Sequence, residues 1–121
     1  MKIVLLMVAI LTVCAPPARA ADPWSTQDMA LQAGYTVLHV IDWGQTLAIA
    51  RDPRRTELNP ILGTHPNVGR VNTYFAATLA AHTLVTHFLP SRWRPWWQGV
   101  TIVAEGATVG WNFAAGLRAG F

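Results

Sequence analysis

The sequence is poor in charged residues and in cysteine, and each shortage excludes a class of function. Only 12% of its 121 residues are charged, about half of what a soluble globular domain carries, while 52% are hydrophobic. Cys14 is the only cysteine. Because it falls in a segment that we expect to be removed, the mature chain has none, which excludes disulfides, thiolate metal sites and cysteine nucleophiles.

Basic residues barely outnumber acidic ones once the N-terminal segment is set aside. The chain has nine basic and six acidic residues, but Lys2 and Arg19 lie in the first twenty positions. The remaining basic residues are all arginine and nearly balance the acidic ones, so we expect no nucleic-acid binding. The chain also has no P-loop, nucleophile-elbow or dinucleotide-binding motif.

The first twenty residues have the layout of a secretory signal peptide. Lys2 is followed by an apolar run at 3–13 and by a small-x-small cleavage site at 18–20. The run is too short to cross a bilayer as a helix. Two alternatives stay open: an uncleaved membrane anchor, and a lipoprotein signal that ends at Cys14.

The mature part, residues 21–121, is predicted to be a single all-α domain. Apolar stretches cover 30–50, 71–89 and 96–117, and each has about the 20 residues that a helix needs to span a bilayer. A loop at 51–70 joins the first two stretches. We therefore expect a three-helix membrane bundle that follows the signal peptide.

The arginines and tryptophans indicate how these helices would cross a bacterial inner membrane. Cleavage leaves the mature N-terminus in the periplasm, so the first helix runs inward and the loop at 51–70 is cytoplasmic. The cytoplasmic side then carries five arginines and the other side two, in agreement with the positive-inside rule. Trp24, Trp93, Trp96 and Trp97 fall at periplasmic helix ends, as in an interfacial aromatic belt.

Polar residues recur at helical spacing along one face of each predicted helix. Since polar groups avoid lipid, we expect these stripes to face one another inside the bundle. An Asp near the middle of a helix costs about 2.5–3.5 kcal/mol on insertion scales, which keeps open a soluble, secreted helical protein. The stripes are Gln32, Tyr35, His39, Asp42 and Thr46, then Asn72, Phe75, Leu79, His82 and Thr86, and finally Thr101, Glu105, Thr108 and Asn112.

Two histidines and a carboxylate fall at the same predicted depth. At about 1.5 Å of rise per residue, His39 and His82 lie roughly 16 Å, and Glu105 roughly 18 Å, from the cytoplasmic helix ends. Imidazole and carboxylate ligands suit Zn or non-haem Fe, so these three are candidate metal ligands, and Asp42, one turn away, is a candidate general base. The alternatives are a hydrogen-bonded network that holds the helices in register, and a proton or ion path.

The loop at 51–70 combines polar side chains with turn-forming residues. Glu57 and His65 are candidates to complete a site at the cytoplasmic end of the bundle. In the alternative, the loop is a well-turned connector in which Glu57 and Asn59 act as caps. The apolar residues Ile61 and Leu62 are expected to turn back onto the bundle or into the membrane.

Two short motifs in the middle of the chain resemble a known family. The motifs are Asp-Trp-Gly-Gln-Thr at 42–46 and Glu-Leu-Asn-Pro-Ile-Leu-Gly at 57–63, and they resemble small, uncharacterised membrane proteins of bacteria and bacteriophages. The resemblance implies an inner-membrane protein from a bacterium or a phage, and it implies no activity. The positions that match the family pattern are Asp42, Thr46, Glu57, Asn59, Pro60 and Gly63.

These features predict a small inner-membrane protein of the cell envelope that interacts with or modulates a partner. Gly106 and Gly110 form a G-x-x-x-G in the third helix, which predicts close packing of helices, including those of two copies of the chain. The alternatives are a membrane metalloprotein or metal-dependent hydrolase, and a soluble secreted binding protein.

Overall fold

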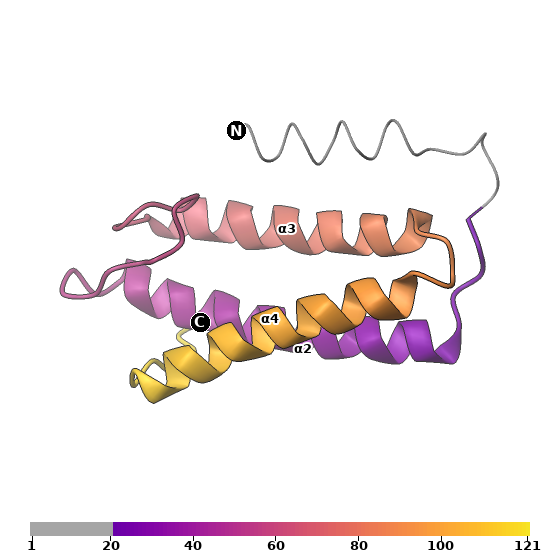
Figure 1. Ribbon diagram of the computed structural model, residues 1–121. Coiled ribbons are helices and arrows are strands. Elements are labelled where there is room, and N and C mark those ends of the chain that lie inside the picture. The colour runs from indigo at the N-terminus through magenta and orange to yellow at the C-terminus, as the bar shows by residue number, and fades with distance from the viewer. Residues whose placement is uncertain (1–20) are drawn as a thin grey trace.

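The computed structural model describes residues 21–121, which form a bundle of three α-helices (Figure 1). Helix α2 covers Thr26–Ala50, α3 covers Val68–Phe88 and α4 covers Arg94–Ala114. The described residues contain no strand, so the prediction of an all-α, three-helix domain is confirmed. The predicted signal peptide at 1–20, with its cysteine, lies outside the described residues.

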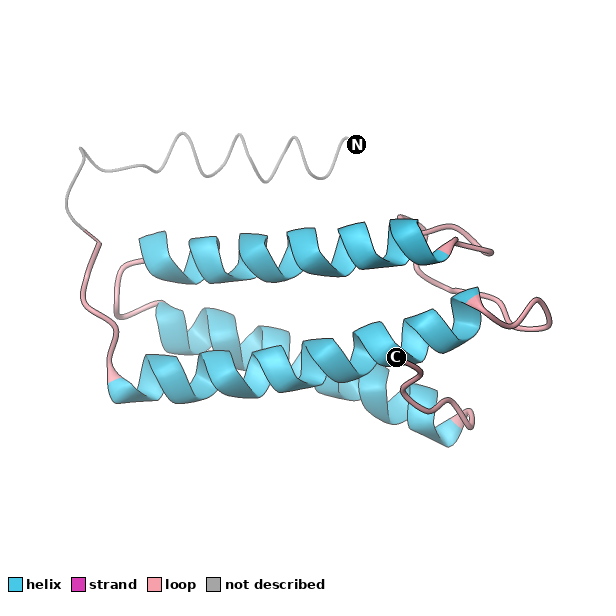
Figure 2. Ribbon diagram, turned by 180° about the vertical axis from the view of Figure 1, so that it is seen from behind, coloured by secondary structure: helices cyan, strands magenta, loops and turns pink. Residues whose placement is uncertain are grey.

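Helix α2 is the central element, because its backbone lies close to both other helices, while α3 and α4 contact each other mainly through side chains near the turn that joins them. Figures 1 and 2 show α3 and α4 close together at the turn that joins them and diverging toward their other ends. By mean hydropathy, none of the helices within residues 21–121 is long and apolar enough to cross a membrane.

Side-chain caps explain why two helices begin earlier than the predicted positions 30 and 71. The Ser25 hydroxyl accepts a hydrogen bond from the Asp28 backbone N–H, and the Asp28 carboxylate accepts one from the Ser25 N–H, each at 3.0 Å. This reciprocal capping box extends α2 toward the N-terminus. Asn67 caps α3 in a similar way, because its side-chain oxygen accepts from the Arg70 N–H at 2.8 Å. Pro95 lies in the first turn of α4, where the missing N–H of proline leaves no helical hydrogen bond unmade.

The loop between α2 and α3 folds back onto the bundle through Leu62. The Asn59 carbonyl accepts hydrogen bonds from the N–H groups of Leu62 and Gly63, both at 3.1 Å, and Gly63 has a φ of 80° that glycine adopts without strain. Of the two apolar residues, Leu62 turns onto the bundle, as one of the two predicted alternatives has it, whereas Ile61 does not and is 60% exposed. The apolar core that this loop completes consists of Leu47, Leu62, Val71 and Phe75.

Helix α4 ends three residues before the predicted Leu117, and the chain then returns to α2. Gly116, with a φ of 81°, reverses the chain, and the Leu117 N–H donates to the Asn112 carbonyl at 2.9 Å. Further along, the Gly120 N–H donates to the Gly44 carbonyl at 2.9 Å. The C-terminal residues therefore lie against the last two turns of α2.

Gly44 is the residue of α2 that makes room for these C-terminal residues. A Cβ atom at Gly44 would lie 2.7 Å from the Phe121 ring and 2.8 Å from the Ala119 methyl group. We expect Gly44→Ala to release residues 119–121 and leave the bundle folded, because the obstructing groups follow the last helix. The release is measured as faster trimming by carboxypeptidase. The control is Gly34→Ala, whose Cβ would meet Ile102 at an ordinary 3.9 Å; equal trimming of the two variants would contradict the prediction.

Candidate functional site

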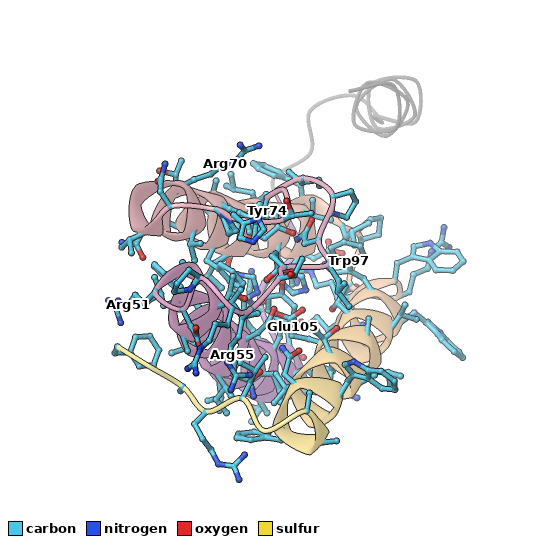
Figure 3. The ribbon with its side chains drawn as sticks, turned by 90° about the vertical axis from the view of Figure 1, so that its left-hand side faces the viewer. Arg51, Arg55, Arg70, Tyr74, Trp97 and Glu105 are labelled. Carbon is cyan, nitrogen blue, oxygen red and sulfur yellow. The ribbon has the colours of Figure 1, made fainter. Side chains whose placement is uncertain are left out.

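His39 and Glu105 meet in the interior of the bundle, between α2 and α4. His39 Nδ1 lies 2.6 Å from Glu105 Oε1, and the two side chains are 4% and 18% exposed. The other ring nitrogen, Nε2, lies 3.1 Å from the Phe75 carbonyl oxygen and 3.2 Å from the Thr78 hydroxyl. Figure 3 shows Glu105 in the space between the three helices.

The hydrogen-bond partners of His39 place one proton on Nε2 and a second one between Nδ1 and Glu105. A carbonyl oxygen only accepts hydrogen bonds, so Nε2 carries a proton and donates it to Phe75. The contact between Nδ1 and Glu105 then holds one further proton. It is either on the ring, as an imidazolium–carboxylate ion pair, or on the acid, as a neutral pair. The pair is thus a buried proton-holding group that joins α2 to α4, and its Nε2 end reaches α3.

His82 is buried beside this pair, but its ring is directed elsewhere. It stacks on Tyr35 with ring centroids 3.6 Å apart and lies 5.1 Å from the Trp97 ring. His82 Nε2 is 2.9 Å from the Thr101 hydroxyl, while Nδ1 is buried and has no hydrogen-bond partner among the described residues. The Tyr35 hydroxyl lies 3.3 Å from His39 Nδ1, so Tyr35 connects the two histidines.

The predicted metal ligands therefore do not surround a common point. Residues 21–121 contain no group of three or more His, Cys, Asp or Glu side chains that could hold a metal ion. His39 uses both ring nitrogens in hydrogen bonds and contacts Glu105 directly, while His82 stacks on an aromatic ring and turns Nε2 toward α4. Their arrangement is that of the hydrogen-bonded network, which the sequence analysis left open as an alternative.

Asp42, the predicted general base, lies in a second polar contact between α2 and α4. Asn112 Nδ2 donates to Asp42 Oδ1 at 3.0 Å and to Gln45 Oε1 at 3.1 Å. Thr46, one turn further on, is also buried. The inward positions predicted for Thr46 and Asn112 are thus confirmed. The inward position predicted for Thr108 is wrong, because Thr108 is exposed and Val109 takes the buried position next to it.

The loop residues of the predicted site stabilise the loop itself. The Glu57 carboxylate accepts a hydrogen bond from the Asn59 N–H at 2.8 Å, and the Asn59 side chain accepts one from the Ile61 N–H at 3.0 Å. His65 is exposed, and its ring lies 3.2 Å from the Thr64 hydroxyl. Glu57 and Asn59 act as turn caps within the loop, rather than as the helix caps that a connector was expected to need.

Arg94 is an interior site that the sequence analysis missed. Its side chain is 0% exposed, and each of the five N–H donors of the guanidinium group has an acceptor. Four acceptors are backbone carbonyls and the fifth is the Asp28 carboxylate, at 3.3 Å from Nη1. Arg94 thereby joins the N-terminal segment, the start of α2 and the turn before α4. The carbonyls belong to Asp22, Pro23, His87 and Leu89.

Three acidic groups of the interior thus have a partner on another helix, and such pairs hold the helices in register without a ligand. No protein-family model, curated protein or solved structure matches this chain. The distribution of polar and apolar side chains is therefore the basis for a functional proposal. The pairs are Glu105 with His39, Asp42 with Asn112, and Asp28 with Arg94.

Proposed function

We propose that this chain is a small integral protein of the bacterial inner membrane that acts by contact with other membrane components and not by catalysis. The observation that carries the proposal is an interior rich in polar side chains beneath an outer surface with large exposed hydrophobic side chains. Among the described residues, eight polar or charged and eight apolar side chains are buried. In a bilayer, polar side chains turn toward the bundle interior and pair with one another, as they do here.

The outward surface supports the same proposal. Helix α4 exposes Trp96, Val100, Val103 and Trp111, each with at least 65% of its surface accessible. A mean hydropathy mixes the inward polar face of a helix with its outward face. The mean hydropathy of a helix with a polar inward face is therefore lower than the hydropathy of the outward face that it would present to lipid. Exposed apolar patches of this extent are typical of membrane or protein contact.

The two ends of the bundle differ as a cytoplasmic and a periplasmic end would. Arg51, Arg55 and Arg70 lie at the loop end (Figure 3), where arginine outnumbers acidic residues. The opposite end carries the exposed Trp93 and Trp96. The proposal places the loop end in the cytoplasm and the mature N-terminus in the periplasm. The resemblance to bacterial and phage membrane proteins agrees with this location.

The proposed contact surface is the outer face of α4. Of the two glycines in its G-x-x-x-G, one packs within the chain and the other is open to a partner. A Cβ at Gly106 would lie 3.7 Å from Leu38, so Gly106 packs against α2 within the chain. A Cβ at Gly110 would meet nothing within 4 Å. Gly110 therefore leaves the backbone of α4 open to close approach by a helix of a second copy or of another protein.

Single-cysteine labelling tests the membrane location. A Cys14→Ser chain is a suitable background, because the sequence has no other cysteine. After an alkaline carbonate wash we expect the protein to stay in the membrane. A membrane-impermeant maleimide should label Ser91→Cys in intact spheroplasts and His65→Cys only after disruption, because these exposed residues lie at opposite ends. Val103→Cys, in the middle of α4, should react slowly in both.

The same labels distinguish the soluble alternative. Rapid labelling of Ser91→Cys, His65→Cys and Val103→Cys in the periplasmic fraction would contradict the membrane proposal. The protein would then be a secreted helical bundle, and the apolar face of α4 would be a surface for a soluble partner.

A further inference from the structure

A groove opens at the loop end of the bundle, between the end of α2, the loop and the last turns of α4. Its volume is about 530 Å³, which lies within the range of about 300–1,000 Å³ typical of small-molecule sites. Most of its surface is apolar. The apolar side chains of its walls are Ile49, Leu58, Ala107, Trp111, Ala115 and Leu117.

The walls of the groove include one charged residue, Arg55, whose side chain is 40% exposed. Arg55 Nε lies 3.5 Å from an oxygen of Asp52. The same carboxylate accepts two hydrogen bonds from the Arg54 side chain, at 3.1 and 3.2 Å. These bonds hold the pKa of Asp52 below its ordinary value, so Asp52 is ionised. One negative charge is thus shared by two guanidinium groups, and a net positive charge remains beside the groove.

We propose that this groove binds an anionic phospholipid, with the phosphate on Arg55 and an acyl chain along Leu58 and Trp111. A guanidinium group binds phosphate through paired hydrogen bonds, and the apolar walls suit an alkyl chain. The hydroxyl of Thr56 and the amide of Asn112 also line the groove, where a headgroup would need hydrogen-bond partners. An exposed Leu58 beside an arginine is explained by such a ligand.

The inference rests on the proposed membrane location, which places the loop end at the cytoplasmic leaflet. Anionic lipids gather against positively charged segments at that surface. Charge alone would give a diffuse attraction shared by the arginines of the loop end. The groove adds a defined position, because in it the guanidinium group of Arg55 adjoins an apolar channel.

Lipid binding to the purified mature protein tests the inference. Native mass spectrometry in a neutral detergent compares phosphatidylglycerol with phosphatidylethanolamine of the same acyl chains. Both lipids offer a phosphate to Arg55, but the ammonium group of phosphatidylethanolamine is repelled by the arginines. We therefore expect phosphatidylglycerol, which has no positive charge, to bind about tenfold more tightly. Arg55→Gln should remove this preference. Arg92→Gln makes the same change of charge at the other end and should keep it. Ala107→Trp fills the groove without changing the charge and should weaken binding of both lipids.

Three results would overturn the lipid site: equal binding of the two lipids, equal effects of Arg55→Gln and Arg92→Gln, or full competition by soluble glycerol phosphate, which has no acyl chain. Circular dichroism of each variant separates loss of binding from loss of fold. The cysteine labelling described above is independent of these results. A chain that spans the membrane but shows no preference for phosphatidylglycerol would disprove the lipid site and leave the membrane location intact.

Discussion

Replacing Arg94 with alanine is expected to destabilise the bundle by about 3–5 kcal/mol, which is the usual effect of removing one partner from a buried ion pair. The Asp28 carboxylate would stay buried without its counter-charge, since its side chain is only 4% exposed. Four backbone carbonyls would also lose a hydrogen-bond donor. Because these carbonyls belong to the N-terminal segment and to the end of α3 with the turn that follows it, the loss should loosen the whole end of the bundle opposite the loop.

Two further variants separate the charge of Arg94 from its geometry. Arg94→Lys keeps the positive charge but has three donors on a single nitrogen, which cannot reach five acceptors around a planar fork. We expect an intermediate loss of stability. Arg92→Ala is the matched control. Arg92 makes a weak cation–π contact, in which its guanidinium carbon lies 5.9 Å from the centroid of the Trp93 ring. Its effect should stay below about 1 kcal/mol.

The measurement is thermal or denaturant unfolding of the purified protein in one detergent, followed by circular dichroism. An Arg94→Ala variant that is no less stable than Arg92→Ala would contradict the structural role of the guanidinium group. A double variant with Asp28→Asn refines the interpretation, because an asparagine oxygen can still accept from the Ser25 N–H of the capping box. If the buried ion pair dominates, removing the Asp28 charge as well should recover part of the stability, because no uncompensated charge then remains in the interior.

Helical periodicity was sufficient to place most of the central polar contacts. Tyr35 and His39 are one turn apart on α2, and Glu105 lies on the polar stripe of α4, so their burial follows from spacing alone. Thr108 shows the limit of this reasoning. Helix α4 crosses α2 at an angle and diverges from α3, so the face that it buries is not a straight stripe along the helix (Figure 2).

Equal depth of two residues does not decide which way their side chains turn, and this is why the three candidate metal ligands do not meet at one point. His82 has the depth that spacing predicted, but Tyr35 offers its ring a stacking surface and Thr101 offers its nitrogen a hydrogen bond. These contacts depend on packing that spacing does not specify. The contacts of Arg94 could not be predicted from local spacing either, because its acceptors include residues more than sixty positions away.

A trace of the Arg94 site is nevertheless present in the sequence. In a bundle of three helices that run alternately up and down, the first and third helices start at the same end. An acidic residue in the first turn of α2 and a basic residue at the start of α4 are therefore brought to one end by topology alone. Asp28 and Arg94 meet this condition. Counting Arg92 and Arg94 only as the two arginines of the side opposite the loop obscured it.

Glu105→Ala is expected to destabilise the protein by about 1–3 kcal/mol, because it leaves the buried His39 Nδ1 without the Glu105 contact. Glu105→Gln should destabilise it by less than about 1 kcal/mol. The difference follows from the proton positions on His39. Since Nε2 donates to the Phe75 carbonyl, a neutral His39 has an unprotonated Nδ1 that needs a donor. The amide of a glutamine at position 105 supplies one, and an alanine does not.

The Tyr35 hydroxyl gives this prediction an internal check. It lies 3.3 Å from His39 Nδ1 and is placed to donate once the acid is gone. Tyr35→Phe should therefore destabilise the Glu105→Ala variant more than it destabilises the Glu105→Gln variant, in which Nδ1 is already paired. Unfolding of the four variants under one condition measures the difference. If Gln and Ala at position 105 destabilise the protein equally, the contact with Nδ1 does not hold α2 and α4 together, and Glu105 is kept for its charge instead.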